Sequence, residues 1–149
     1  MKYIYLPLAC LLLIFSSCKK DEKEKFAITG LWNMTNYSQN GVNYTNSFSV
    51  YEADINANGT AELTQEQGNS GYETSYTYIL NADQTTLNLT GVTEQTYDVT
   101  TLDATSPLND YSSHSSTYSV SNFTNNTITL TMVSTTTLGL SSQVMNLGK

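Results

Sequence analysis

The sequence contains no arginine, and it has only one histidine, two cysteines and two prolines among its 149 residues. Its 6 lysines are outnumbered by 13 acidic residues, so the formal net charge is −7. Because nucleic-acid-binding surfaces neutralise phosphates with clusters of lysine or arginine, this composition excludes nucleic acid as a partner. The histidine and the cysteines leave little material for a zinc site or for thiol redox chemistry, and we predict no cofactor.

The first residues have the pattern of an export signal. Lys2 supplies a positive charge, and residues 4–15 form an uncharged run. As a helix this run would be about 18 Å long, which is shorter than the ~30 Å hydrocarbon core of a bilayer, so we do not interpret it as a transmembrane helix. Small residues then precede Cys18, as a signal peptidase requires. We predict a signal peptide over residues 1–17.

The segment Phe15-Ser16-Ser17-Cys18 resembles a bacterial lipobox. The resemblance implies that Cys18 is lipidated with acyl chains such as palmitate and becomes the first residue of the mature protein. The membrane would then be a partner through this anchor, since each buried methylene contributes about 0.8 kcal/mol. The alternative is an ordinary cleaved signal peptide, with Cys18 as a free thiol.

A run of seven charged residues follows, over residues 19–25. Because it contains no apolar anchor, we interpret residues 18–26 as the lipidated cysteine and a solvated tether. Lys20-Asp21-Glu22 resembles the export tag of Bacteroidetes-type lipoproteins, which implies display on the outer face of the outer membrane. The alternative is a polar spacer on the periplasmic side.

Residues 27–149 have the composition of one all-β domain. Thr, Ser, Asn and Tyr are frequent, no apolar stripe has helical spacing, and Pro107 is the only proline in this segment. Threonine and tyrosine favour strands, whereas asparagine and serine favour turns. We predict an antiparallel up-and-down meander of about eight strands. Closure into a small barrel would remove its exposed edges, and an open β-sandwich is the alternative.

Alternation of apolar and polar residues locates the strands and their inward faces. Trp32 and Met34 share one face, as do Phe48 and Val50, with Ile55 following after a shift of register. The same alternation selects Ala61, Leu63, Tyr72, Tyr76, Tyr78, Leu80, Leu87, Leu89, Tyr97, Val99, Tyr118, Val120, Ile128, Leu130 and Met132. The tail over residues 133–149 either adds a last strand that closes the sheet against the first or frays.

The segment Ile28-Thr29-Gly30-Leu31-Trp32, followed by Asn40-Gly41 and then Asn58-Gly59-Thr60, resembles the start of bacterial lipocalin-like domains. The strand over residues 76–80, a polar turn and the Leu-x-Leu strand over residues 87–89 fit the same family. The resemblance implies an eight-stranded barrel whose tryptophan plugs one end, with a small apolar or amphipathic molecule as ligand.

Tyrosine is abundant, with 11 in the chain. Aromatic rings line apolar pockets and stack on sugars, and the hydroxyl can orient a ligand. The alternative role of such residues is core and cross-strand packing. The alternative function is that of a structural or adhesive surface lipoprotein, which binds glycan or protein through an aromatic outer face. We name five candidate ligand-binding residues, which are Trp32, Tyr76, Tyr78, Tyr97 and Tyr118.

Two motifs resemble chemical sites without completing them. The segment Asp54-Ile55-Asn56-Ala57-Asn58-Gly59 matches the first half of a calcium loop, but Gln65 stands where the bidentate acid should be. We interpret it as a hairpin turn and predict no metal site, although an oxygen site that uses Asp54 and Glu52 is an alternative. His114 lies in a serine-rich loop without a Gly-x-Ser-x-Gly turn, so we predict no catalytic residue and no enzymatic activity.

Overall fold

A computed structural model of the chain describes residues 25–136 and 140–149. The predicted signal peptide and nearly all of the predicted tether lie outside these ranges, as do both cysteines. The described part of the chain contains no helix that is long and apolar enough to span a lipid bilayer. The predicted boundaries at residues 17 and 26 stay predictions.

Strands make up nearly all of the regular structure in the described ranges. The one helix is a single 3-10 turn, η1 (Thr45–Ser47). The strands are β1 (Gly30–Gln39), β2 (Val42–Asn43), β3 (Val50–Ile55), β4 (Thr60–Gln67), β5 (Ser70–Leu80), β6 (Thr86–Asp98), β7 (Asn109–Asp110), β8 (Ser115–Ser121), β9 (Thr127–Thr135) and β10 (Gln143–Gly148). The prediction of an all-β domain is confirmed.

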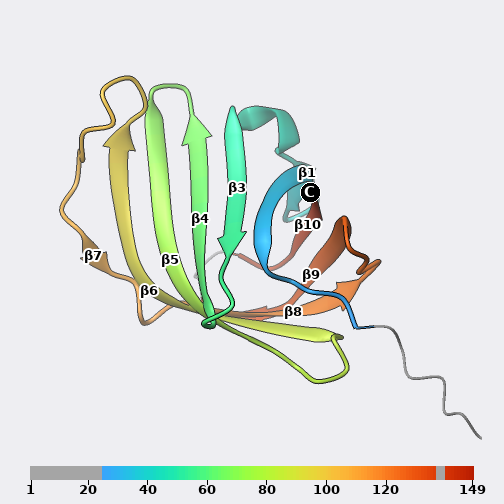
Figure 1. The fold of residues 1–149 in the computed structure, drawn as a ribbon. Helices are drawn as coiled ribbons and strands as arrows, with labels where there is room; N and C mark the ends of the chain where they lie inside the picture. The colour runs from blue at the N-terminus through green and yellow to red at the C-terminus, as the bar shows by residue number, and fades with distance from the viewer. Residues whose placement is uncertain (1–24, 137–139) are drawn as a thin grey trace, which may run out of the picture.

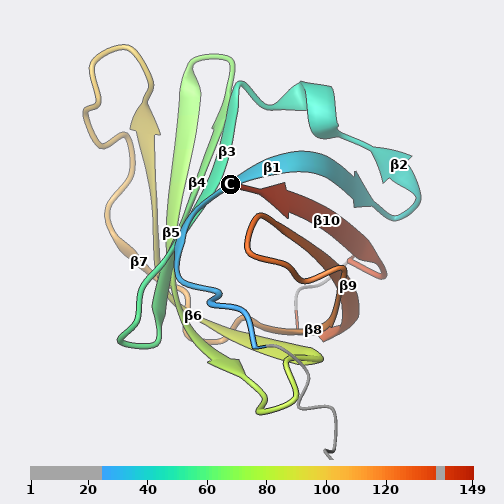
Figure 2. The ribbon, with the colours of Figure 1, turned by 45° about the vertical axis from the view of Figure 1, so that its right-hand side comes forward.

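Eight of these strands form a closed antiparallel barrel (Figures 1 and 2). Their order is β10-β9-β8-β6-β5-β4-β3-β1, and β1 pairs with β10 to close the ring. The two-residue strands β2 and β7 pair only with β1 and β6. Because successive long strands are neighbours, the barrel is the predicted up-and-down meander, and it is not an open sandwich. The tail forms β10 and closes the sheet against the first strand.

Antiparallel strands place their connections alternately at the two ends of the barrel. The turns β3–β4, β5–β6 and β8–β9 lie at the end where β1 begins, which we call the plugged end. The connections β1–β3, β4–β5, β6–β8 and β9–β10 lie at the opposite, open end. At the open end, β5 and β6 continue to pair beyond the last β6–β8 pair, Thr90–Ser115. Tyr72 lies on this extension and is 40% exposed.

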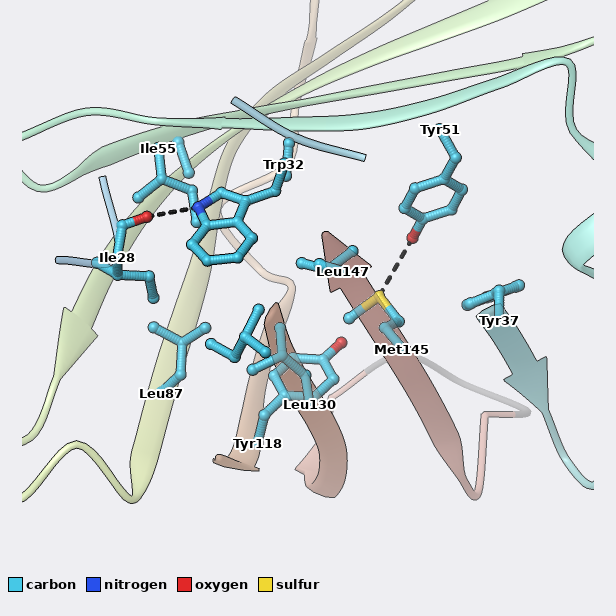
Figure 3. Close-up of a cluster of buried hydrophobic side chains, with 13 residues drawn as sticks. Ile28, Trp32, Tyr37, Tyr51, Ile55, Leu87, Tyr118, Leu130, Met145 and Leu147 are labelled. Carbon is cyan, nitrogen blue, oxygen red and sulfur yellow. Dashed lines mark hydrogen bonds between the residues drawn. The ribbon is translucent and has the colours of Figure 1, made fainter. Parts of the chain in front are cut away.

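The plugged end is filled by Trp32, whose side chain is fully buried (Figure 3). Its Nε1 donates a hydrogen bond to the carbonyl oxygen of Ile28 at 2.6 Å. The ring of Phe123 packs against the indole at 6.4 Å, and the Nζ of Lys149 lies 4.3 Å from the indole centroid. Leu87 and Ile128 are the other two large side chains buried almost completely.

A β-bulge in β1 lets one strand contribute to both halves of the interior. The register against β10 shifts between Met34 and Asn36. Since side chains alternate along a strand, the extra residue brings Tyr37 to the same inner face as Trp32. Both are buried, and Tyr37 lies in the open half of the barrel.

In β3 the predicted inward orientation of Ile55 is confirmed, whereas that of Val50 and the predicted shift of register were wrong. The strand pairs with β4 without a register shift, and its buried residues are Tyr51, Ala53 and Ile55. Val50, at the start of β3, therefore faces away from the interior. Phe48 precedes the strand and packs against the core from there.

The predicted inward orientation of Tyr97 was also wrong. Ser75 of β5 pairs with Thr93 and Tyr76 pairs with Gly91, so Val92 is an extra residue in β6. This bulge reverses the faces of β6 beyond it. Tyr97 consequently lies on the outer face, where its ring covers Gly71 and its hydroxyl donates to the Glu66 carboxylate at 3.0 Å.

Candidate functional site

The interior of the barrel contains a cavity of about 210 Å³. Its wall extends from Ile55 and Leu87, beside the β3–β4 and β5–β6 turns of the plugged end, to Gln39 and Leu140 at the open end. A cavity of roughly 150 Å³ can hold a benzene-sized guest, and pockets for drug-sized ligands start at about 300 Å³. The volume therefore suits a small molecule or one segment of a longer one.

Most of the wall is apolar. Aliphatic and methionine side chains from five strands and from the β9–β10 connection form it, namely Ala53, Ile55, Ala61, Leu63, Leu87, Leu89, Leu130, Leu140, Met145 and Leu147. Five tyrosines are interspersed among them, namely Tyr37, Tyr51, Tyr76, Tyr111 and Tyr118. The remaining lining residues are Gln39, Glu62, Gln65, Ser116 and Gln143. An apolar body with a few polar contacts is the usual form of a small-molecule site.

Four of these residues form a continuous hydrogen-bonded chain across β8, β10 and β1. The hydroxyl of Tyr118 donates to Oε1 of Gln143, and Nε2 of Gln143 donates to the hydroxyl of Tyr37 at 2.9 Å. The Tyr37 hydroxyl in turn donates to Oε1 of Gln39 at 2.9 Å. We call these residues the glutamine–tyrosine chain. It provides the cavity with uncharged polar groups on one side.

The tyrosines that line the cavity are held in their neutral form by their surroundings. Burial raises the pKa of the Tyr118 phenol to about 12 and raises the pKa of Tyr51 and of Tyr76 well above the usual value. Burial also raises the pKa of Tyr37 and of Tyr111. At neutral pH all five phenols therefore remain protonated, and they offer hydroxyl groups rather than charges.

Tyr51 shows how these hydroxyls are accommodated (Figure 3). Its hydroxyl points across the barrel and donates to the Sδ of Met145 at 3.4 Å. The phenol thus reaches from β3 past the inner face of β1 to β10, near the Trp32 plug.

Tyr111 closes part of the open end from the β6–β8 connection. Its ring stacks on His114 at 3.9 Å and meets Tyr76 edge-on at 6.1 Å. Gly91 leaves the room for this ring, because a Cβ at that position would lie 2.4 Å from a ring carbon of Tyr111. Two backbone hydrogen bonds fix the connection here, from Tyr111 to Val92 at 3.0 Å and from Gly91 to His114 at 2.8 Å.

The five candidate ligand-binding residues fall in different places. Tyr76 and Tyr118 line the cavity, whereas Trp32 forms the plug. The hydroxyl of Tyr78 donates to the carbonyl oxygen of Asn56 at 2.9 Å, which ties β5 to the β3–β4 turn at the plugged end. Tyr97 lies on the outer face, away from the cavity. A ligand-binding role for these residues stays a prediction.

The residues around His114 do not form a hydrolytic triad. Its Nδ1 lies 3.3 Å from the hydroxyl of Ser113, but the Asp110 carboxylate accepts a hydrogen bond from the backbone of Ser112 instead. Within the described ranges no carboxylate is hydrogen-bonded to the imidazole. The ring instead supports Tyr111.

The calcium-like segment forms the tight turn between β3 and β4. Gly59 adopts φ +87° there, and the Asn58 side chain accepts hydrogen bonds from the backbone and hydroxyl of Thr60 at 3.1 and 2.7 Å. Among the described residues no group of three or more His, Cys, Asp or Glu side chains is arranged to hold a metal ion.

The outer surface carries few exposed aromatic rings. Within the described ranges, the large hydrophobic side chains with high exposure are mostly aliphatic, such as Ile79, Leu102 and Val133. The two aromatic ones are Tyr44, beside η1, and Tyr72, on β5. Tyr44 belongs to the connection between β2 and β3, and neither of these strands is a neighbour of β5, so the two rings do not form a stripe.

Comparison with known proteins identifies one family. The family model described as a lipocalin-like domain matches residues 28–106, which is more than half of the chain. The match begins at the segment that caps the Trp32 plug and ends in the β6–β8 connection. No curated protein matches the chain.

Proposed function

This chain belongs to the family of lipocalin-like domains, and from that premise we propose that it binds a small apolar or amphipathic molecule inside its barrel. The observation that carries the proposal is the cavity of about 210 Å³. It is plugged at one end by Trp32, and its wall reaches the open end at Gln39 and Leu140. A ligand that enters there would exchange water for an apolar wall, which is the main source of affinity for such molecules.

Direct binding of a neutral fluorescent probe, N-phenyl-1-naphthylamine, tests this function. We expect its emission to rise with saturation when it enters the cavity of residues 27–149. Ala61→Phe places a ring in the cavity and should abolish most of this signal, whereas Ala57→Phe makes the same change on the exposed β3–β4 turn and should not. Circular dichroism confirms that both variants fold. Equal binding by the two variants would show that the probe binds elsewhere.

We further propose that the protein is a lipoprotein whose Cys18 carries acyl chains and anchors the domain to the outer membrane. The support is the lipobox-like sequence that ends at Cys18. Metabolic labelling with an alkynyl palmitate analogue tests it. Cys18→Ser should lose the label and release the protein from membranes. Cys10→Ser is the matched control, because this cysteine lies in the predicted signal peptide, and it should keep the label. A labelled Cys18→Ser protein contradicts the proposal.

The orientation of the anchored domain has its own test. The resemblance of Lys20-Asp21-Glu22 to a surface-export tag supports display on the cell surface. Protease added to intact cells should then digest the domain, and replacing Asp21 and Glu22 by alanine should protect it. Protection of the unaltered protein would instead support the periplasmic face.

A further inference from the structure

The positive charges of the described chain lie far from the cavity opening. Lys149 donates a hydrogen bond from Nζ to the carbonyl oxygen of Thr29 at 2.8 Å, at the plugged end. Lys25 precedes Phe26, whose backbone exchanges hydrogen bonds of 3.0 and 2.6 Å with the side chain of Gln84 in the β5–β6 turn. These are the two lysines in the described ranges, and the sequence has no arginine. No lysine lines the cavity.

The charges that do lie near the open end are negative. Glu94 is close enough to Tyr76 and Tyr111 that its carboxylate contributes to the raised pKa of both phenols. Glu94 pairs with Thr74 of β5 and with Asn109 of β7, on the part of β6 that extends beyond its pairing with β8 at the open end. Glu62 is also a lining residue, but it lies beside the β3–β4 turn at the plugged end and its exposed side chain faces outward, opposite to that of Ala61. An anionic group that entered at the open end would approach the Glu94 carboxylate and would find no lysine among the lining residues.

The polar groups inside the cavity are uncharged. The glutamine–tyrosine chain consists of amides and hydroxyls, and Gln65 and Ser116 add two more groups of the same kind. Such groups can donate to and accept from a hydroxyl or an amide. They do not compensate the loss of water from a buried carboxylate, which requires a paired charge or several strong donors.

We propose that the cavity selects an electrically neutral amphiphile, with its hydroxyl or amide group toward the glutamine–tyrosine chain, and rejects carboxylates such as fatty acids. The inference rests on the proposed function, since it specifies the ligand of the same cavity. It follows from the absence of lysine among the lining residues, the position of Glu94 at the open end and the neutral hydrogen-bonding wall.

Displacement of N-phenyl-1-naphthylamine by three compounds with the same alkyl chain tests the selectivity. The compounds are 1-octanol, octanoate and octyltrimethylammonium. At neutral pH we expect 1-octanol to displace the probe at a concentration about tenfold or more below that of octanoate. As the pH falls through the pKa of octanoate, its neutral form accumulates, and the two midpoints should converge.

A charge placed inside the cavity should reverse the preference. Gln65→Lys puts an ammonium group on an inward position of β4, and Thr64→Lys adds the same charge at the preceding residue, which faces outward. We expect Gln65→Lys to strengthen octanoate binding about tenfold relative to 1-octanol, and Thr64→Lys to keep the ratio of the unaltered protein. If Gln65→Lys does not fold, the pH series on the unaltered protein tests the same claim.

The outcomes separate the two proposals. Octanoate binding as tightly as 1-octanol at neutral pH, or a preference for octyltrimethylammonium, overturns the selectivity and leaves the binding function intact. Failure of the probe and of all three compounds to bind overturns the binding function itself. Tighter binding of 1-octanol, together with the reversal in Gln65→Lys, supports both.

Discussion

The two ends of the barrel contain different kinds of side chain. At the plugged end the side chains of Trp32, Leu87 and Ile128 are almost completely buried, and Trp32 closes the barrel beneath the cavity. The open half contains five tyrosines and a hydrogen-bonded chain around a cavity. Because a void forfeits packing contacts that a filled core would make, the plugged end is expected to carry most of the stability. The residues around the cavity then contribute less to stability, so their side chains can be suited to a ligand.

Of the substitutions proposed here, removal of the Trp32 side chain should lower the stability of the domain most. Trp32→Ala deletes a fully buried indole, its hydrogen bond to Ile28 and its contact with Lys149. We expect a loss of about 3–5 kcal/mol in the free energy of unfolding, measured by urea denaturation. Tyr111→Ala, which removes a partly exposed ring at the open end, is the comparison and should cost less than half as much. Similar losses for the two variants would contradict the contrast between the ends.

Alkaline pH should destabilise the domain through the buried phenols that line the cavity. The folded protein holds Tyr118 with a pKa of about 12, against 10.0 for an unperturbed phenol. Above about pH 10 the unfolded chain loses this proton first, so the folded state binds more protons and stability falls as the pH rises. As the pH rises from about 10 to about 12, Tyr118 alone should lower the free energy of unfolding by roughly 2–3 kcal/mol. Denaturation midpoints measured from pH 8 to about pH 12 should fall less steeply in Tyr118→Phe. An unchanged slope would exclude this residue as the cause.

A methyl group at Gly91 should disturb the open end without reaching the plug. The Cβ of Gly91→Ala would lie 2.4 Å from Tyr111, so the ring must move. Overpacking of this kind costs about 1–3 kcal/mol, and probe binding should change with it. The double variant with Tyr111→Ala loses the contact with the ring but keeps the one with the Tyr111 carbonyl oxygen, which is also at 2.4 Å. Its loss in the free energy of unfolding should therefore be smaller than the sum of the losses in the two single variants. Additive losses would mean that the ring does not contribute to the clash.

The smallest effect on stability is expected from a substitution on the outer face of the barrel. Asp54 and Glu62 are paired directly across β3 and β4, and like charges in that arrangement repel. Asp54→Asn should therefore stabilise the domain by about 0.2–1 kcal/mol in low salt. The gain in melting temperature should shrink as salt is added, because salt screens exposed charges. A gain that is independent of salt would point to a cause other than repulsion.

The outline of the fold was predictable from the sequence because it depends on alternation and turns. The period of two along the strands, with turns such as Asn58-Gly59, indicated about eight antiparallel strands, and the apolar residues of the tail allowed for a closing strand. The Gly30-Leu31-Trp32 motif pointed to the family that the comparison then identified. Alternation, turns and this motif are local signals, because each of them involves only a few consecutive residues.

The cavity could be predicted only in part, because two bulges and one loop decide which side chains reach it. Val92 is the residue whose insertion turns Tyr97 outward, and no feature of the sequence around it marks a bulge. The bulge in β1 brings Tyr37 inward in the same way. Tyr111 comes from a connection rather than a strand, so alternation gave no information about it.

By itself, the sequence determined that the chain forms a β-meander with an acidic, arginine-free composition and a tryptophan in its first strand. The tertiary structure decided that the meander closes, that Trp32 fills one end and that tyrosines and glutamines from distant strands surround a space at the other. The physical reason is the separation along the chain of the residues that interact. Alternation and turn preferences act between near neighbours, whereas closure, register and the orientation of a loop ring depend on pairings between residues as far apart as Asn33 and Gly148.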